Sequence, residues 1–286
     1  MLLIVGYVII LAAAVGTYAV HGSLAALWMP LEYVAIFGLA LGGFVAGNGI
    51  KTVKATLAAL PSVFKGSHLN KALYMDLLAM LFEILAKVRK EGLMSIENDI
   101  ENPHESAVFS RYPNIVKDHH VMEFICDYLR MMVGGNLNAF EIENLMDIEI
   151  ETHHQEAHVP AHAVSKLADA VPAFGIVVAV MGVVNVMGSV GAPPAVLGKM
   201  IGGALVGTFL GVFLAYGMVG PFASKLKAVL DEEIHFYRLI REVLVANLYQ
   251  HPPQICIEVG RQNTPGHNRP SFTELEEALK ATKEAA

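Results

Sequence analysis

Four histidines form the clearest group of potential metal ligands in this chain. His154, His158 and His162 follow one another at intervals of four residues, which places side chains on one face of an α-helix. Pro160 is expected to interrupt that helix, and neither an HExxH pattern nor a cysteine accompanies the histidines. We therefore interpret the group, with His153, as a solvated polar face, and metal binding is the alternative.

The second candidate is a run of charges, Lys87-Val-Arg89-Lys90-Glu91 followed by Glu97-Asn-Asp99-Ile-Glu101. Taken alone, such a run indicates a solvated surface. No Ser/His/Asp set, P-loop, GxGxxG pattern or paired carboxylates occur in a suitable context, so we expect neither an enzyme nor a cofactor. The two cysteines, Cys126 and Cys256, lack metal or redox spacing and are expected to be ordinary thiols.

The elements that hold these residues are mostly apolar. The chain has 286 residues, of which 54% are hydrophobic and 16% charged, and its mean hydropathy is +0.48. Soluble domains have about 25% charged residues. Asp, Glu, Lys and Arg are absent from 1–31, 33–50, 170–198 and 200–224. A helix of roughly 20 apolar residues crosses the hydrocarbon core, and only a helix satisfies its own backbone there.

We therefore predict an all-α polytopic membrane protein with four transmembrane helices and a helical cytoplasmic domain. The predicted spans are 2–20, 33–50, 170–190 and 200–222. The corresponding regions are 1–50 for the first two spans, 51–169 for the cytoplasmic domain, 170–222 for the last two spans and 223–286 for a cytoplasmic helix and tail. Residues 1–20 lack the charged start and cleavage site of a signal peptide.

Basic residues set the expected orientation. Lys51, Lys54 and Lys65 follow the second span, and Lys225 and Lys227 follow the fourth. Under the positive-inside rule, both termini and 51–169 lie in the cytoplasm.

Local signals also predict the cytoplasmic helices. Apolar residues on one face of 69–91 predict a helix that ends at Gly92. Asn138-Ala-Phe-Glu141 resembles a cap before a helix ending near Pro160, and Ser271-Phe-Thr-Glu274 forms a capping box for a helix over 272–284. Another helix is expected over 224–249, and the proline-containing stretch 252–270 is expected to be irregular.

The spans contain small residues at intervals of four. Gly203, Gly207 and Gly211 repeat along the fourth span, and Gly175 precedes Ala179 by four in the third. Such stripes allow close helix approach, either within the chain or against a partner or pore, so an obligate assembly is plausible.

The predicted spans contain no Asp, Glu, Lys, Arg or His, and Asn48, Asn185, Ser189, Thr208 and Tyr216 are their main polar residues. Proton pathways normally use an ionisable relay in the membrane. Either this chain moves no ions, or a partner helix supplies the carboxylate.

Two prolines occupy the predicted cytoplasmic ends of the third and fourth spans. Pro172 suits the first turn of a helix, and Pro221 a kink or an end. The alternative is a pair of hinges at the mouth of a conduction path.

Several of these segments resemble the MotA family of flagellar stator subunits. In the fourth span, 204–213 and Pro221 fit the family signature, and 169–182 resembles its third span. Four cytoplasmic segments resemble the family as well: 74–78, 99–103, 127–130 and 149–153.

The resemblance implies partners and roles. MotA subunits form a homo-oligomer, a ring of five in related structures, around two MotB helices that supply the membrane aspartate. Their cytoplasmic domain pushes on the rotor protein FliG, for which the matching positions are Arg89, Glu97 and Glu149. The resemblance also implies a location in the bacterial inner membrane. Pro172 and Pro221 match prolines that couple conduction to conformational change.

The resemblance also bears on the ion. Sodium-type relatives carry a second hydroxyl residue where this chain has Ala179, near Thr208. Dehydrated Na⁺ needs several oxygen ligands, so a proton-driven stator is favoured over a sodium-driven one. An ExbB/TolQ-type proton-channel energiser and a purely structural membrane scaffold remain as alternatives.

Overall fold

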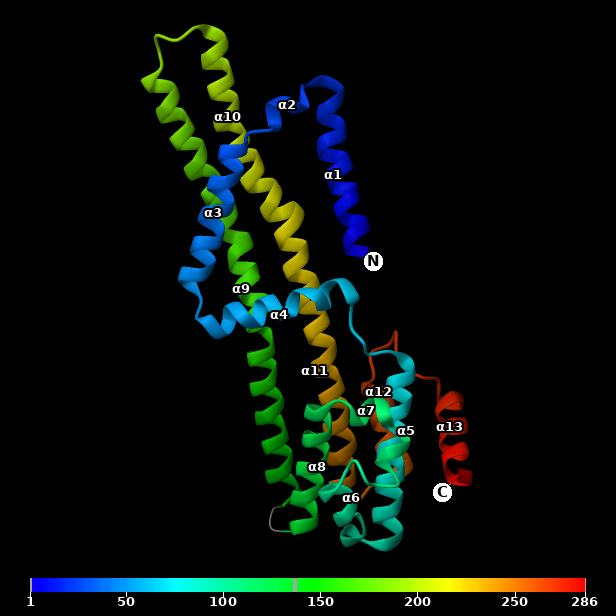
Figure 1. Ribbon diagram of the computed structural model, residues 1–286. Coiled ribbons are helices and arrows are strands. Elements are labelled where there is room, and N and C mark those ends of the chain that lie inside the picture. The colour runs from blue at the N-terminus through cyan, green and yellow to red at the C-terminus, as the bar shows by residue number, and fades with distance from the viewer. Residues whose placement is uncertain (1, 136–137, 286) are drawn as a thin grey trace. The chain divides into compact units, whose positions relative to one another are not determined.

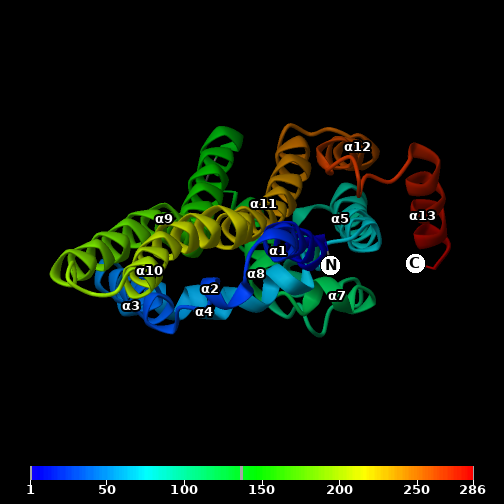
Figure 2. The same ribbon diagram turned by 90° about the horizontal axis from the view of Figure 1, so that it is seen from above.

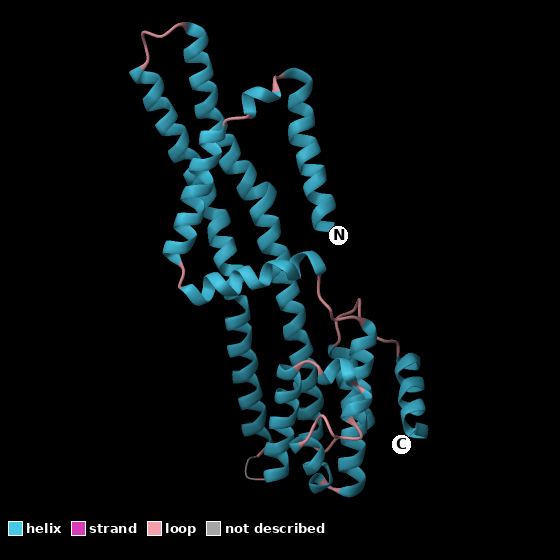
Figure 3. Ribbon diagram, in the orientation of Figure 1, coloured by secondary structure: helices cyan, strands magenta, loops and turns pink. Residues whose placement is uncertain are grey.

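The protein is helical throughout the part that the structure describes, which is residues 2–135 and 138–285 of a computed structural model. Short connections join the helices, and no strand occurs in these residues (Figures 1 and 3). The helices cluster into two compact units: unit 1 comprises Met1–Gly66 and Ala157–Leu230, and unit 2 comprises Ser67–Glu156 and Asp231–Ala286. The predicted all-α class is confirmed.

Among the described residues, four helical segments are long and apolar enough to cross a membrane, which confirms the predicted number. The first two contain α1 (Leu2–His21) and, after the short α2 (Leu24–Leu27), α3 (Pro30–Gly47). The other two contain α9 (Ala139–Gly188) and α10 (Pro194–Val212).

The helices α3 and α10 begin earlier than predicted. Each starts at a proline in its first turn, where the missing N–H is harmless. Glu32 therefore lies in the first turn of α3, and Lys199 lies inside α10. The two helices therefore extend beyond the starts of the predicted spans, and each carries one charge near its N-terminus.

In unit 1, α3 packs beside α9 and α10 (Figures 1 and 2). Ile36 of α3, which is fully buried, shares a core with Val171 and Val178 of α9 and Leu210 of α10. The helix that follows, α4 (Ile50–Lys65), packs through Val63 on α9 and α11 (Gly220–Leu248).

The helix α9 is continuous over 50 residues and holds both Pro160 and Pro172 in its interior. The predictions that a helix ends at Pro160 and that Pro172 lies in a first turn are therefore wrong. An interior proline removes a hydrogen bond and clashes with the preceding turn. Next to the prolines, however, Ala161 and Val171 are 3% exposed and packed against other helices, and this packing holds the backbone in place.

Unit 2 contains most of the remaining helices around one hydrophobic core. The core includes Leu77 and Ile84 of α5 (Lys71–Glu91) and Leu239 of α11, all fully buried. Unit 2 also contains the part of α9 before Ala157. Its other elements are η1 (Leu93–Ile96), α6 (Glu97–Glu101), η2 (Phe109–Arg111), α7 (Pro113–Val116), α8 (His119–Gly134), α12 (Pro253–Asn263) and α13 (Phe272–Ala285).

The predicted capping signals are confirmed. The Asn138 side chain accepts from the Glu141 N–H at 2.9 Å, and the Glu141 carboxylate accepts from the Asn138 N–H at 2.9 Å. Ser271 and Glu274 exchange the same pair of bonds at the start of α13. Gly92 ends α5 with a φ of +88°, a conformation that glycine adopts without strain.

The prediction that 252–270 is irregular is wrong over 253–263, where α12 forms. Pro253 is its first residue, where proline favours a helix rather than opposing it. Burial of Cys256 and Ile257 then holds α12 on the core. Both cysteines are buried free thiols, and burial raises the pKa of Cys126 to about 12 and that of Cys256 to about 11.

Candidate functional site

The turn between α5 and α6 is organised by a partly buried ion pair. Lys87 Nζ lies 2.7 Å from Oδ2 of Asp99, whose side chain is only 8% exposed. Ser106 Oγ donates a second hydrogen bond to Oδ1 of Asp99, at 2.6 Å. Asp99 is therefore an anchor, and the prediction that 87–101 is a solvated surface is wrong at this residue.

Arg89 and Glu97 face away from that anchor. Residues two apart on an α-helix point in directions that differ by about 200°. Because Lys87 and Asp99 face each other, Arg89 on α5 and Glu97 on α6 are directed outward. Both are exposed, and neither forms an ion pair with another described residue. Between them, Met94 is 64% exposed, so this surface presents a cation, a thioether and an anion.

A cavity of about 360 Å³ opens beside Arg89 within unit 2. Its apolar lining includes Val88 of α5, Met132 of α8 and Leu248 of α11, and His251 adds a polar group. Its volume lies within the range of small-ligand pockets and is large enough to hold a side chain of a partner protein.

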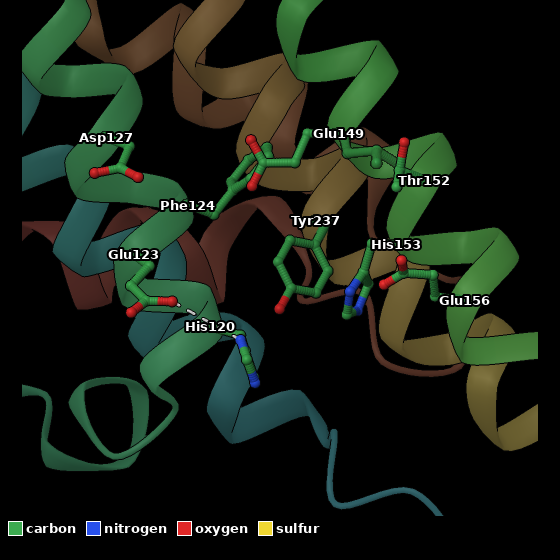
Figure 4. A pocket seen from close by; sticks show the side chains of 10 residues that line it. His120, Glu123, Phe124, Asp127, Glu149, Thr152, His153, Glu156 and Tyr237 are labelled. Atoms are coloured by element: carbon green, nitrogen blue, oxygen red, sulfur yellow. Dashed lines mark ion pairs between the residues drawn. The ribbon is translucent and has the colours of Figure 1, made fainter. Parts of the chain in front are cut away.

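Glu149 lies in a different place, on a groove between α8 and α9. Its Oε2 accepts a hydrogen bond from the Tyr128 hydroxyl at 2.7 Å. The groove has a volume of about 330 Å³, and Figure 4 shows side chains from α8, α9 and α11 along its walls. Its charged and polar lining comprises His120, Glu123, Asp127, Glu149, Thr152, His153, Glu156 and Tyr237.

The charge of this groove comes from its four carboxylates. Burial lowers the pKa of His153, and nearby His120 lowers it further, so His153 tends to remain neutral. Burial raises the pKa of the Tyr237 hydroxyl, which also remains neutral. The groove is therefore negative at neutral pH and suits a positively charged side chain better than an anion.

In unit 1, glycines bring α9 and α10 into backbone contact. A Cβ on Gly175 would lie 2.8 Å from the Gly207 carbonyl oxygen and 2.9 Å from Gly211 Cα. A Cβ on Gly203 would instead lie 3.1 Å from a carboxylate oxygen of Glu32 on α3. These approaches are intramolecular, and they account for Gly175, Gly207 and Gly211 without a partner chain.

The same contact places Ala179 against the turn that carries Thr208. A Cβ on Gly207 would lie 3.3 Å from the backbone nitrogen of Ala179, and Thr208 is the next residue on α10. Thr208 is half-buried, and its hydroxyl forms no hydrogen bond with the residues described. This hydroxyl is therefore available to a ligand or a partner helix.

Pro221 lies just after η3 (Phe213–Val219), a π-helical turn that joins α10 to α11. At about 100° per residue, an uninterrupted α-helix would turn Ala223 about 120° and Leu226 about 60° away from the face of Gly211. A π turn takes up about one extra residue. Gly211 and Ala223 consequently both pack against α9.

One of the four histidines on α9 is buried rather than solvated. His158 is 3% exposed, so a solvated face is wrong at this position. His162 is exposed, and His154 Nε2 lies 3.8 Å from Asp231 Oδ1. The burial of neighbouring Ala161 and Val164 shows that the core reaches this part of α9.

An ion-pair centre at Arg241 on α11 has no counterpart among the sites predicted from the sequence. This guanidinium lies 2.9 Å from Glu143 and 2.7 Å from Asp147, both on α9. The partners are more than 90 residues apart in sequence, and no local motif marks them.

Comparisons with known proteins cover nearly the whole chain. Residues 4–92 match the family described as Motility protein A N-terminal, and residues 117–238 match the MotA/TolQ/ExbB proton channel family. The chain is 48% identical to Motility protein A of Escherichia coli over 284 residues, covering 99% of this chain and 96% of the relative. It is 45% identical to Motility protein A of Salmonella typhimurium over 284 residues, which again cover 99% of this chain and 96% of the relative.

A solved structure confirms the fold. The flagellar MotAB stator complex from Bacillus subtilis contains a chain that superposes with a TM-score of 0.72, covering 96% of this chain and 98% of that one at 24% identity. Four apolar helical segments and the two family matches agree with this likeness. The chain therefore belongs to the MotA family of flagellar stator subunits and is a multi-pass protein of the inner membrane.

Proposed function

We propose that this chain, assembled with MotB, couples proton flow across the inner membrane to torque on the rotor protein FliG. The carrying observation is that 170–198 and 200–224, which supply the last two membrane segments, contain no Asp, Glu, Lys or Arg. A proton path through hydrocarbon needs a carboxylate or a similar relay. A MotB aspartate would supply it, inside a ring of about five copies of this chain.

The ion path of the proposal runs past α9 and α10. Thr208 offers one hydroxyl, and Ala179 beside its turn offers none. A single hydroxyl is a poor site for dehydrated Na⁺, which supports a proton-driven rather than a sodium-driven motor. Each proton that crosses 100 mV releases about 2.3 kcal/mol. Pro172 and Pro221 would convert that step into a change of helix shape.

The rotor contact of the proposal is the outward surface of the α5–α6 turn. Arg89 and Glu97 are exposed and have no ion-pair partner among the described residues, so their charges are available to FliG. Glu149 has the weaker case because the Tyr128 hydroxyl already engages its carboxylate. For this contact the termini and unit 2 must be cytoplasmic, as the basic residues after the second and fourth spans predict.

Charge reversal tests the rotor contact. Arg89→Glu and Glu97→Lys should each slow swimming while membrane levels and MotB association stay normal. Lys90→Glu is the matched control, because Lys90 is 83% exposed, adjoins Arg89 and makes only a 4.0 Å contact with Glu91. Opposite reversals on FliG should restore speed to the first two variants. Normal swimming of the Arg89→Glu/Glu97→Lys double variant would refute the contact.

Two measurements test the rest of the proposal. Swimming speed should follow the proton-motive force and stay constant when Na⁺ is varied at fixed force; dependence on Na⁺ would refute the proton assignment. Co-purification should recover a single-span partner with a membrane aspartate and a peptidoglycan-binding domain. Recovery of an outer-membrane energising partner instead would favour the ExbB/TolQ-type alternative.

A further inference from the structure

The helix α4 has one side that is packed within unit 1. Val63 is 2% exposed and shares a small core with Ala161 and Val164 of α9 and with Leu226 of α11. Thr56, on the same side, is 4% exposed, and its hydroxyl bonds to a backbone carbonyl one turn earlier. These contacts fix which side of α4 faces outward.

An apolar stripe runs along the outward side. Ile50, Leu57 and Phe64 are 69%, 60% and 50% exposed, respectively. They are spaced seven residues apart, which places them in one line along an α-helix. A continuous apolar line of this kind on an otherwise amphipathic helix is typical of a surface that meets a membrane or a partner.

Lysines border this stripe on one side. At about 100° per residue, Lys54 and Lys65 lie roughly 40–60° from the direction of Ile50, and Lys51 lies roughly 100° from it. All three are exposed, and none forms an ion pair with a described residue. The helix itself contains no Asp or Glu.

We propose that α4 lies in the membrane interface and binds anionic phospholipid through Lys51, Lys54 and Lys65, with Ile50, Leu57 and Phe64 among the acyl chains. The membrane-spanning helix α3 ends at Gly47 and α4 begins at Ile50. Three residues of chain reach at most about 10 Å, so the start of α4 cannot leave the bilayer surface. Lipid is therefore the occupant available at this position, and the uncompensated lysines select anionic headgroups. This inference does not depend on the proposed coupling to MotB or FliG.

The expected selectivity is large. A basic residue near an anionic surface gains about fivefold in binding, which corresponds to on the order of 100-fold for three lysines that act together. Because the gain is electrostatic, it should fall steeply in high salt.

A tryptophan placed on the stripe tests the inference in the full-length protein. The chain has one tryptophan, Trp28. The Trp28→Phe/Phe64→Trp variant, reconstituted in phosphatidylcholine vesicles, would report contact with brominated lipids by fluorescence quenching. Brominated phosphatidylglycerol should quench more than brominated phosphatidylcholine at the same mole fraction, and high salt should remove the difference. Equal quenching by the two lipids at low salt would overturn the anionic selectivity.

Matched variants separate the possible explanations. Lys51→Gln/Lys54→Gln/Lys65→Gln should abolish the preference for phosphatidylglycerol, whereas Lys117→Gln/Lys280→Gln, which changes lysines outside α4, should leave it intact. Ala55→Trp in the Trp28→Phe background probes the opposite side of α4 and should be quenched little by either lipid. Absence of quenching at position 64 by any brominated lipid would mean that protein covers the stripe, which would overturn the membrane placement.

Discussion

Substitution of Gly211 by alanine should weaken the contact between α9 and α10. The new Cβ would lie 2.8 Å from Gly175 Cα and 3.1 Å from the Val171 carbonyl oxygen. Carbon atoms pack best at about 3.5–4.0 Å, so the two helices would have to separate locally by roughly 1 Å. The atoms in the way belong to the backbone, and no side-chain rotation relieves them. Overpacking costs about 1–3 kcal/mol, against about 1 kcal/mol that alanine gains over glycine in a helix, so a net loss of up to about 2 kcal/mol is expected.

The matched control is Gly202→Ala in the same helix. An added Cβ at this position meets nothing within 4 Å, so the variant should be as stable as the wild type or more stable. Thermal unfolding of the purified stator complex in detergent, with size-exclusion chromatography to follow assembly, would compare the two. Gly175→Ala/Gly211→Ala should lose less than the sum of the single losses, because both act on one contact. Equal unfolding temperatures for Gly211→Ala and Gly202→Ala would refute the reasoning.

Three further predictions concern unit 2. Tyr74→Phe should raise the free energy of unfolding by about 1 kcal/mol, because the buried Tyr74 hydroxyl has no hydrogen-bond partner among the described residues. Tyr128→Phe, which removes a bonded hydroxyl, should lower the free energy of unfolding. Denaturant titrations that rank the two variants the other way would contradict this. Gln250 has a φ of +61°, a conformation that glycine adopts without strain. Gln250→Gly should therefore raise the melting temperature by an amount that corresponds to about 1 kcal/mol of stability, whereas Gln250→Ala should not. Equal melting temperatures for the two variants would exclude backbone strain at this position. Lys71, together with groups at the start of α13, lowers the pKa of Glu274 from 4.5 to about 2. The ionised Glu274 side chain should therefore stabilise α13 fully above pH 4.5, and this stabilisation should decline as the pH falls toward 2. Hydrogen-exchange protection of α13 should show this decline in the wild type and not in Glu274→Gln.

Features set by short-range chemistry could be predicted from the sequence. The absence of charge over 170–198 and 200–224 marks membrane segments because an isolated charge is costly in hydrocarbon. The caps at Asn138 and Ser271 were predicted because a capping side chain bonds to a backbone only three residues away.

Features set by distant neighbours could not be predicted. Pro160 and Pro172 are breakers by local rules, and only the packing of other helices against α9 explains why the helix continues through them. Asp99 looks like any exposed acid until Lys87 and Ser106 are seen to enclose it.

The candidate rotor surface also combines features that the sequence predicts with features that only the folded structure shows. Composition alone assigned Arg89 and Glu97 to solvent, and only the resemblance singled them out. The structure adds the physical reason for their outward direction, which is the ion pair two residues away on each helix. Sequence spacing could not reveal this, because the pair forms only once the turn at Gly92 is made.

The π turn η3 also bears on insertions and deletions in this family. Because it holds about one residue more than an α-helical turn, deletion of one residue between Phe213 and Val219 should leave the faces on both sides of it directed at α9. Deletion of Val206, inside the regular part of α10, should instead rotate everything that follows by about 100° and so lose function. Relatives whose helices differ by one residue at this point can therefore share one fold and one packing, and an alignment gap belongs within 213–219 rather than in the glycine stripe before it.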